Sequence, residues 1–311
     1  MKFGVHLPSN FGFDNVQDVL ELAKLVEDLG FDSVWVSEHI FNAGYIANRL
    51  GDRPYYAPLP VLSAVSAVTK RVRVGTSILV LPYHNPIVLA KDLATIDAVS
   101  QGRLTIGVGV GVIKEEFDAL GYDHAARGKF ADEAMAVMTE LWTKEDPEFE
   151  GQFHSFSGLR FTPKPVQQPH PPFWIGGSSK AAMRRVATVG AGWHLFRYPE
   201  QGLAPALQQV RDKADENGRD GKALVMSARC DLDILDQSRD DSKADYNTDL
   251  GVRFRLEGTS QEIIDGIGEF ERQGIDYLVL AVNTTDREKN FDMIRRFAEE
   301  IGPNFDGALV A

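Results

Sequence analysis

The sequence contains one cysteine, Cys230, among 311 residues. A single thiol excludes an intrachain disulfide, a CxxC redox pair and a metal site built from several cysteines. Long apolar runs are also lacking, because none approaches the length of a membrane span. Since residues 3–7 already read as an apolar strand, no signal peptide is expected. We therefore expect a cytoplasmic protein with no membrane partner.

Positive charge is scarce as well. The chain has 33 Lys and Arg residues against 45 Asp and Glu residues, a formal net charge of −12. A surface of this sign repels phosphate backbones, so we expect no nucleic-acid partner. The sequence has no HExxH motif, no EF-hand loop and no GxSxG elbow. It therefore predicts no metal site and disfavours metal-assisted hydrolysis and serine-type acyl transfer.

Short β-branched runs alternate with amphipathic helical patterns along the whole chain, which is typical of βα units around a parallel sheet. Eight such runs predict a single (β/α)₈ TIM barrel over residues 1–311. The expected strands are Lys2 to Leu7, Ser33 to Ser37, Val72 to Val80, Leu104 to Val108, Phe173 to Gly176, Gly192 to Phe196, Leu224 to Leu232 and Tyr277 to Val282.

Three connections are too long for minimal βα loops, namely 41–60, 145–172 and 233–259. We expect them as insertion loops, with those at the C-terminal face of the barrel helping to hold a substrate. The last of them is rich in aspartate, which fits either a mobile lid or a solvated segment.

Candidate chemistry begins at the end of the second expected strand, where an apolar run stops at Glu38 and His39. Catalytic groups of such barrels come from the C-terminal ends of strands, so a carboxylate beside an imidazole is well placed for acid–base work. The alternative is a histidine that only fixes the following loop. A second imidazole, His194, ends the sixth expected strand, where a core or loop-anchoring role is favoured.

The third expected strand, with Ser77, Ile78 and Val80, offers a surface on which a flat ring could lie. An ordinary buried parallel strand would look the same. After the fourth strand, Gly109 and Gly111 continue an alternation of glycines that would let backbone approach a ligand closely. A tight barrel corner explains these glycines equally well, and the segment does not fit the GxGxxG dinucleotide pattern.

A stronger signal follows the fifth expected strand, where Gly176 and Gly177 lead into Ser178 and Ser179 at the start of a helix. Free N–H groups and serine hydroxyls at a helix N-terminus form a cradle for phosphate. A capped helix after a tight turn is the alternative. Paired glycines exceed what capping requires, which favours phosphate.

Taken in order, these segments resemble the bacterial luciferase-like superfamily of barrel oxidoreductases, in particular its branch that uses the deazaflavin coenzyme F420. The resemblance runs nearly end to end. It rests on Leu29 to Trp35 before Glu38-His39, Thr76 to Pro82 with Asn85-Pro86, Gly102 to Leu104 with Gly107 to Gly111, Glu115 to Phe117, Arg127-Gly128, Pro163 to Gln167, Trp174 to Ser179, Gly190 to Trp193 and Gly258-Thr259.

The resemblance implies that the cofactor ring lies over the third strand, where family members have a non-prolyl cis peptide at the positions of Ser77 and Ile78. It also implies that His39 lies near the ring and steers proton movement, and that Gly176 to Ser179 hold the cofactor phosphate. Two positions depart from the pattern. Val112 stands where the sugar-phosphate dehydrogenase branch has a glutamate acid, and His84 stands where many relatives have arginine.

The leading hypothesis is hydride transfer between coenzyme F420 and a small organic substrate, with His39 and Glu38 as candidate catalytic residues and the cofactor supplying the redox chemistry. One alternative is an FMN-dependent monooxygenase that uses O₂ and reduced flavin from a partner reductase. The other is a non-catalytic flavin-binding barrel. Relatives are commonly dimers, so we expect a homodimer, with a flavin or F420 reductase as a possible partner.

Overall fold

The computed structural model describes residues 1–238, 247–248, 251–305, 307 and 309. Eight parallel strands form a closed ring, because β10 pairs with β14 on one side and with β9 on the other. In chain order the ring contains β1 (Lys2–His6), β2 (Ser33–Val36), β3 (Arg73–Thr76), β5 (Leu104–Gly109), β8 (Phe173–Gly176), β9 (Gly192–Leu195), β10 (Val225–Ile234) and β14 (Tyr277–Ala281). The closed TIM barrel predicted from the sequence is confirmed.

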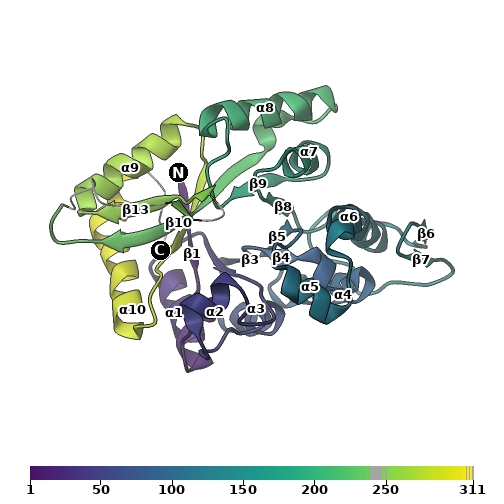
Figure 1. Ribbon diagram of the computed structural model, residues 1–311, viewed down its shortest axis with the longest axis horizontal. Coiled ribbons are helices and arrows are strands. Elements are labelled where there is room, and N and C mark those ends of the chain that lie inside the picture. Colours follow the sequence, from purple (N-terminus) through teal and green to yellow (C-terminus); the bar gives the residue numbers. More distant parts are fainter. Residues whose placement is uncertain (239–246, 249–250, 306, 308, 310–311) are drawn as a thin grey trace.

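Helices surround the ring (Figure 1). Their apolar side chains pack into the same core as those of the strands. They are α1 (Val16–Asp28), α3 (Pro58–Val68), α4 (Pro86–Val99), α6 (Arg127–Thr143), α7 (Lys180–Thr188), α8 (Leu203–Glu216), α9 (Ser260–Arg272) and α10 (Arg287–Arg296). None of the helices in the described ranges is long and apolar enough to cross a membrane.

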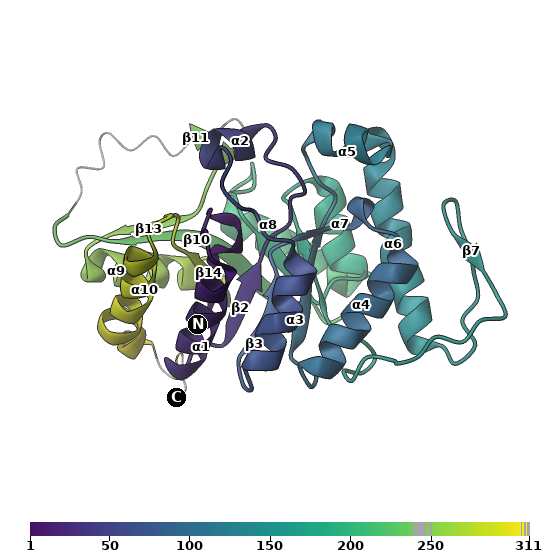
Figure 2. The same cartoon turned by 90° about the horizontal axis from the view of Figure 1, so that it is seen from below.

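Shorter elements occupy the long connections. Helices α2 (Tyr45–Leu50) and α5 (Lys114–Leu120) follow strand ends and lie at the C-terminal end of the barrel (Figure 2). The 145–172 segment forms a hairpin of β6 (Phe149–Glu150) and β7 (Ser155–Phe156), which projects away from the barrel. The 233–259 segment contains β11 (Asn247–Thr248), β12 (Gly251–Val252) and β13 (Arg255–Gly258); its acidic residues 240, 241, 245 and 249 lie outside the described residues.

An aromatic layer fills the interior of the barrel below its C-terminal rim. The Trp35 ring stacks on Trp174 at 5.0 Å and on His194 at 5.3 Å between ring centroids. Gly4 and Gly75, on the two strands beside β2, make room for it, because a Cβ atom at either would come within 2.6 Å of the indole. The interior of the barrel is therefore filled by packed side chains and is not an open channel.

The third expected strand, 72–80, is not continuous. Strand β3 ends at Thr76, the Ser77–Ile78 peptide bond is cis, and β4 (Leu79–Val80) resumes the pairing with β5. The sequence missed the interruption because both pieces belong to one apolar run. The cis bond lies at the position that the resemblance implied.

The glycines of β5 accommodate this interruption. A Cβ atom on Gly107 would stand 1.8 Å from the Thr76 carbonyl oxygen, and one on Gly109 would stand 2.1 Å from Cδ1 of Ile78. A Cβ atom on Gly111, beyond the strand, would meet Val80 at 2.7 Å. Close packing within the barrel thus accounts for the alternating glycines, although the backbone of Gly109 and Gly111 also borders the cavity described below.

We predict that Gly107→Ala lowers the free energy of unfolding by about 3 kcal/mol, because the new methyl group meets backbone that cannot rotate away. Gly268, inside α9, is a matched control: its nearest neighbour is the mobile end of Arg272, at 3.4 Å. Gly268→Ala should be neutral or stabilising by up to about 1 kcal/mol. Urea unfolding of both variants measures the difference, and equal stabilities would contradict this account.

Candidate active site

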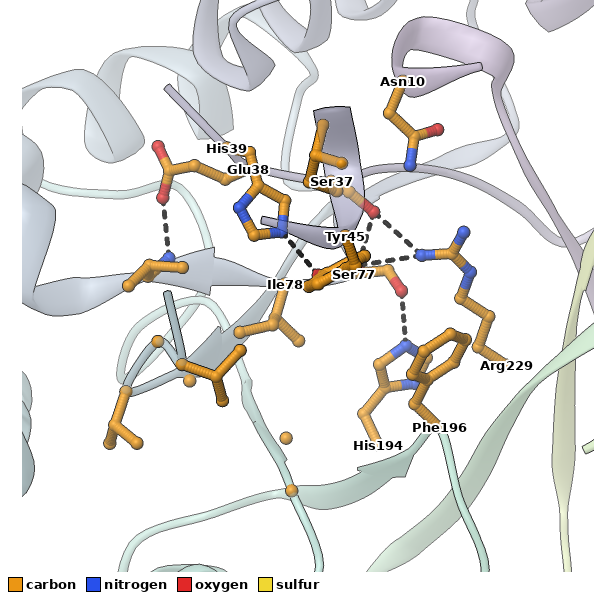
Figure 3. A pocket seen from close by; sticks show the side chains of 18 of the residues that line it. Asn10, Ser37, Glu38, His39, Tyr45, Ser77, Ile78, His194, Phe196 and Arg229 are labelled. Carbon is orange, nitrogen blue, oxygen red and sulfur yellow. Dashed lines mark hydrogen bonds between the residues drawn. The ribbon is translucent and has the colours of Figure 1, made fainter. Parts of the chain in front are cut away.

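A cavity of about 240 Å³ opens at the C-terminal end of the barrel (Figure 3). Of the residues predicted from the sequence as site residues, all except Ser178 and Ser179 line it. The lining residues are Asn10, Ser37, Glu38, His39, Tyr45, Ile46, Arg49, Tyr55, Ser77, Ile78, Val80, Gly109, Val110, Gly111, Val112, Gly176, Gly177, His194, Phe196, Arg197, Arg229 and Arg253. Residues of the first strands, the 41–60 loop and strands β8, β9 and β10 therefore share one cavity.

His39 is held at both ring nitrogens. Nδ1 lies 2.9 Å from Oε2 of Glu116, and Nε2 lies 2.9 Å from the Tyr45 hydroxyl. A carboxylate only accepts, so Nδ1 carries the proton and, in the neutral ring, Nε2 accepts from Tyr45. The basic nitrogen of His39 therefore points toward a hydroxyl on the cavity wall.

Glu116, on α5, is the residue that fixes His39. Its side chain is fully buried and also accepts from the Tyr83 hydroxyl at 2.6 Å and from the backbone N–H groups of Ile40 and Phe41. Burial pushes the pKa of Glu116 upward, but the hydrogen bonds from His39, Tyr83 and Ile40 outweigh it, so the pKa is lowered. Glu116 remains ionised at neutral pH and orients the imidazole.

Glu38 lines the same cavity, yet both of its carboxylate oxygens have partners elsewhere. Oε2 accepts from the Val80 N–H at 2.6 Å, and Oε1 lies 2.7 Å from Nε2 of His84. The residue thus anchors β4 and the loop that follows it. Its predicted catalytic role stays a prediction. His84 forms an ion-pair contact with Glu38 instead of pointing into the cavity as a free side chain.

A chain of buried polar groups forms the floor beneath the cavity. The Ser77 hydroxyl lies 2.8 Å from Nε2 of His194, whose Nδ1 lies 2.9 Å from the Ser227 hydroxyl. On the other side, the Ser37 hydroxyl donates to the Ser77 carbonyl oxygen and lies 2.6 Å from Nε2 of His6. This network fixes the Ser77 backbone where the third strand is interrupted.

Both floor histidines are neutral. Burial, followed by the positive charge of Arg229, lowers the pKa of His194 to about 3. Burial is also the main cause that lowers the pKa of His6. His194 therefore has the core role favoured by the sequence, while it also borders the cavity. Of the histidines bordering the cavity, His39 is the one with partners suited to moving a proton.

The expected phosphate cradle lies at the edge of the cavity. Gly177 has a left-handed backbone (φ 90°), and Ser179 caps α7 by accepting from the Ala182 N–H. Capping uses the Ser179 hydroxyl but leaves other N–H groups of the first turn without helical partners, as at any helix N-terminus. Ser178 and Ser179 are exposed beside the cavity. Their predicted contact with phosphate stays a prediction.

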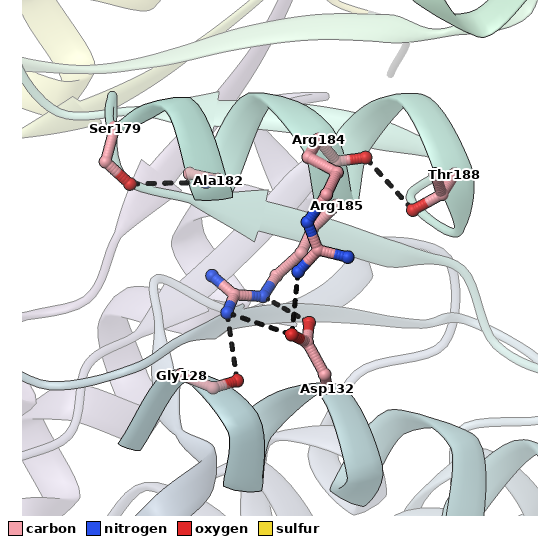
Figure 4. A network of polar contacts seen from close by, with 7 residues as sticks. All are labelled: Gly128, Asp132, Ser179, Ala182, Arg184, Arg185 and Thr188. Atoms are coloured by element: carbon pink, nitrogen blue, oxygen red, sulfur yellow. Dashed lines mark hydrogen bonds and ion pairs between the residues drawn. The ribbon is translucent and has the colours of Figure 1, made fainter. Parts of the chain in front are cut away.

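An ion pair holds the cradle helix in place (Figure 4). Arg185 of α7 is nearly buried, and its Nε donates to Oδ1 of Asp132 on α6 at 2.7 Å. Its Nη2 donates to the carbonyl oxygen of Gly128 at 2.9 Å. These contacts of Arg185 with α6 therefore help to fix the position of α7 and its N-terminus.

Sequence reasoning missed several residues of the site. Glu116 was noticed only as part of the resemblance, and neither Tyr45 nor Tyr55 was considered. Arg229 carries a signal that could have found it, since a charged residue stands within an otherwise buried strand. Arg49 lies in the short helix α2 and Arg197 and Arg253 lie in loop segments, where a cation gives no sequence signal of a site. Within the described residues, no group of three or more His, Cys, Asp or Glu could hold a metal ion.

A family model described as luciferase-like monooxygenase matches residues 1–232. The chain belongs to the luciferase-like monooxygenase family. This confirms the family named in the sequence analysis. Its relatives include oxidoreductases that use a flavin and others that use the deazaflavin coenzyme F420.

Two relatives illustrate the division. The FMNH₂-dependent dimethylsulfone monooxygenase of Pseudomonas putida is 32% identical over 222 residues, which are 70% of this chain and 59% of that enzyme, less than two thirds of its length. The F420-dependent glucose-6-phosphate dehydrogenase of Amycolatopsis mediterranei is 28% identical over 267 residues, 82% of this chain and 76% of that enzyme. A solved monooxygenase from Streptomyces bottropensis is 27% identical, with a TM-score of 0.81 over 98% of this chain and 99% of that one.

We predict that Glu116→Gln destabilises this luciferase-like protein by about 2 kcal/mol at neutral pH, because its hydrogen bonds lose a charged acceptor. Since the folded pKa of Glu116 is lowered, its contribution is complete above the unfolded value of about 4.3 and is lost as the pH falls through the folded value. The difference in unfolding free energy between Glu116→Gln and wild type should therefore shrink at acid pH. Urea unfolding at neutral and acid pH measures it.

Glu115→Gln is the matched control for that experiment, because Glu115 is the exposed neighbour on the same helix. It should leave the unfolding free energy within about 0.5 kcal/mol of wild type. A gap for Glu116→Gln that stays constant with pH, or that Glu115→Gln reproduces, would count against the ionised, His39-orienting role.

A second prediction concerns His194. Because its folded pKa is near 3, the ring should keep the signals of a neutral imidazole between about pH 5 and 8. The folded protein becomes less stable as the pH falls below the pKa of about 6.5 that His194 has in the unfolded chain, since the unfolded chain then binds the proton first. Histidine ring NMR, assigned with His194→Gln, makes the measurement. A midpoint inside that range would disprove burial of the neutral ring.

Proposed function

We propose that this protein transfers a hydride between coenzyme F420 and a small organic substrate bound in the cavity at the barrel mouth. The observation that carries the proposal is the placement of His39 between Glu116 and Tyr45 at the cavity wall, opposite the interrupted third strand. When bound, the deazaflavin supplies the redox chemistry by giving or taking the hydride.

The lining of the cavity fits a flat ring with a polar tail. Ile78, Val80 and Val110 provide an apolar surface, and Gly176 and Gly177 lead from it to the N-terminus of α7. The Tyr55 ring packs 5.6 Å from the His39 ring, and its buried hydroxyl has no hydrogen-bond partner within the described chain, so it is available to a ligand. We assign the ring to the apolar surface and its phosphate to residues 176–179.

His39 would manage the proton that accompanies hydride transfer. Glu116 holds the Nδ1 proton, so Nε2 is the atom that exchanges a proton with the substrate, either directly or through the Tyr45 hydroxyl. Burial raises the pKa of Tyr45, so the phenol stays protonated and can donate. While the Tyr45 hydroxyl donates to Nε2, its oxygen can accept a proton from the substrate, and protonated Nε2 returns that proton by the same route in the reverse direction.

Oxidation of a sugar phosphate by the route of the glucose-6-phosphate dehydrogenase relatives is not part of the proposal. Val112, at the position of that branch's glutamate acid, is an apolar side chain at the cavity rim with 56% of its surface exposed. It cannot exchange a proton. The substrate we propose is therefore one whose proton is handled by His39 alone.

A second candidate is an FMN-dependent monooxygenase that receives reduced flavin from a separate reductase. Two of its relatives favour this candidate, since the Pseudomonas putida enzyme and the solved Streptomyces bottropensis protein are both monooxygenases. The same ring surface and phosphate cradle would serve FMN. Cofactor preference is therefore the measurement that separates the two candidates.

We predict that the purified protein binds F420 at least about tenfold more tightly than FMN, a difference of about 1.4 kcal/mol. Fluorescence titration of each cofactor, in oxidised and reduced form, measures it. Tight FMN binding with negligible F420 binding would replace the first candidate by the second. Binding without turnover on any substrate tested would instead favour a non-catalytic flavin-binding barrel.

For the proton role, His39→Gln should lower turnover by about 10²-fold or more, as for loss of a general acid–base group, and leave cofactor affinity within about threefold. His154→Gln is a control, because His154 pairs with Glu133 away from the cavity. Stopped-flow kinetics and cofactor titration give the two readouts. A His39→Gln enzyme with unchanged turnover would remove His39 from the mechanism.

A further inference from the structure

Four arginines form one wall of the cavity, and the proposed chemistry uses none of them. We call Arg49, Arg197, Arg229 and Arg253 the arginine wall. They come from α2, the segment after β9, β10 and the segment before β13. Three of them surround the Phe196 ring: the guanidinium carbons of Arg197, Arg229 and Arg253 lie 5.1, 5.1 and 4.6 Å from its centre.

The wall is short of acceptors. Nε of Arg197, Arg229 and Arg253 is buried and has no hydrogen-bond partner in the described part of the chain. Arg229 is 8% exposed, and only its Nη1 is engaged, by the Ser37 hydroxyl at 3.0 Å and the Ser77 carbonyl oxygen at 3.5 Å. Buried donors without partners are costly, so their retention points to a ligand that accepts from them.

The charges of the wall are not balanced by protein groups within the described residues. Asp231 is the one carboxylate that contacts it, 3.4 Å from Nη1 of Arg253. The carboxylates of Glu38 and Glu116 already accept hydrogen bonds at both oxygens from groups outside the wall. In a chain with a net charge of −12, four cations against one anion at a single wall form a local positive site.

Burial and mutual repulsion both disfavour the charged form of these arginines. Burial lowers the pKa of Arg229 to about 10, and burial followed by repulsion from Arg253 lowers the pKa of Arg197. Both guanidinium groups remain charged at neutral pH, since arginine does not deprotonate in proteins. An anion placed among them would relieve the repulsion and accept from the unpaired Nε–H groups.

We propose that the arginine wall binds the anionic group of an organic substrate, a carboxylate or a sulfonate, while the uncharged part of that substrate packs against Phe196, Tyr45 and Tyr55. This deepens the proposed function, on which it rests, by naming the class of substrate. A guanidinium fork matches a pair of oxygens in either group. The reacting end of the substrate then faces His39 across the cavity.

A phosphate of the cofactor has the same chemistry as the substrate anion and is the competing occupant. We assign the wall to the substrate because the cofactor phosphate has its own candidate cradle at Gly176 to Ser179, on the N-terminus of α7. The arginine wall instead comes from β10, the segments after β9 and before β13, and α2. Separate titrations with substrate-like and cofactor-like probes distinguish the two occupants.

The test uses benzoate and benzamide, which share a shape and differ in charge. Calorimetric titration of the full-length protein at constant ionic strength should show benzoate bound at least about tenfold more tightly than benzamide, because charge-assisted hydrogen bonds exceed neutral ones. Equal affinities for the two probes, or binding of neither, would overturn the proposal.

Arginine variants locate the effect. Arg253→Met and Arg197→Met keep an unbranched apolar stem and remove the charge, and each should weaken benzoate binding at least about fivefold, with benzamide binding within twofold of wild type. Arg160→Met is the control: Arg160 is 77% exposed and its nearest carboxylate is 3.9 Å away. Circular dichroism and unfolding curves check that each variant folds. Unchanged benzoate affinity in both wall variants would refute the assignment.

Flavin titrations identify the occupant. FMN and riboflavin differ by the phosphate, so a wall that serves the cofactor would lose FMN affinity in Arg253→Met and Arg197→Met while riboflavin affinity stayed unchanged. That result would overturn the substrate assignment. Unchanged FMN and F420 affinity, with benzoate binding lost, supports it. If benzoate binds through the wall but neither cofactor binds, the proposed function fails while the anion site stands.

Discussion

The candidate site depends on one close packing contact, that of Ile78 with the glycines of the neighbouring strands. The side chain occupies space that Cβ atoms on Gly109 and Gly176 would fill. The third strand can therefore turn inward across the barrel mouth and resume at β4, where Glu38 receives the Val80 N–H. The same turn presents Ser77 to the buried network of the floor. Ring surface, floor and loop anchor all follow from this contact.

The barrel was predictable because strand periodicity and helix amphipathicity are local properties. The interruption at Ser77 was not, since β-branched residues typical of a strand stand on both sides of it. His39 could be proposed from its place at a strand end. Glu116 could not be linked to it, because the partners are 77 positions apart and only the folded chain brings α5 over the second strand. Residues whose role depends on a distant partner need tertiary structure to be found.

Electrostatics divides the cavity into two parts with different tasks. On one side Glu116 stays ionised and fixes a single imidazole tautomer, so the proton has a defined donor and acceptor. On the other side, positive charge accumulates on side chains that burial makes more costly to leave unpaired. The floor between them is uncharged, because both of its histidines are neutral. A bound molecule would therefore meet a gradient of potential from one wall to the other.

Strand β10 is longer than the ring requires, and this has an effect on how the site can evolve. Its first half pairs with β9 through residues 225–228, whereas residues 231–234 pair with β13 instead. The ring is therefore split at its rim, and the segment around Arg253 bridges back to Arg197 across the split. Changes in these two segments can alter the shape and charge of one wall of the cavity without changing a residue that pairs strands of the closed ring. Ligand preference and barrel stability are in this way encoded by different stretches of the chain.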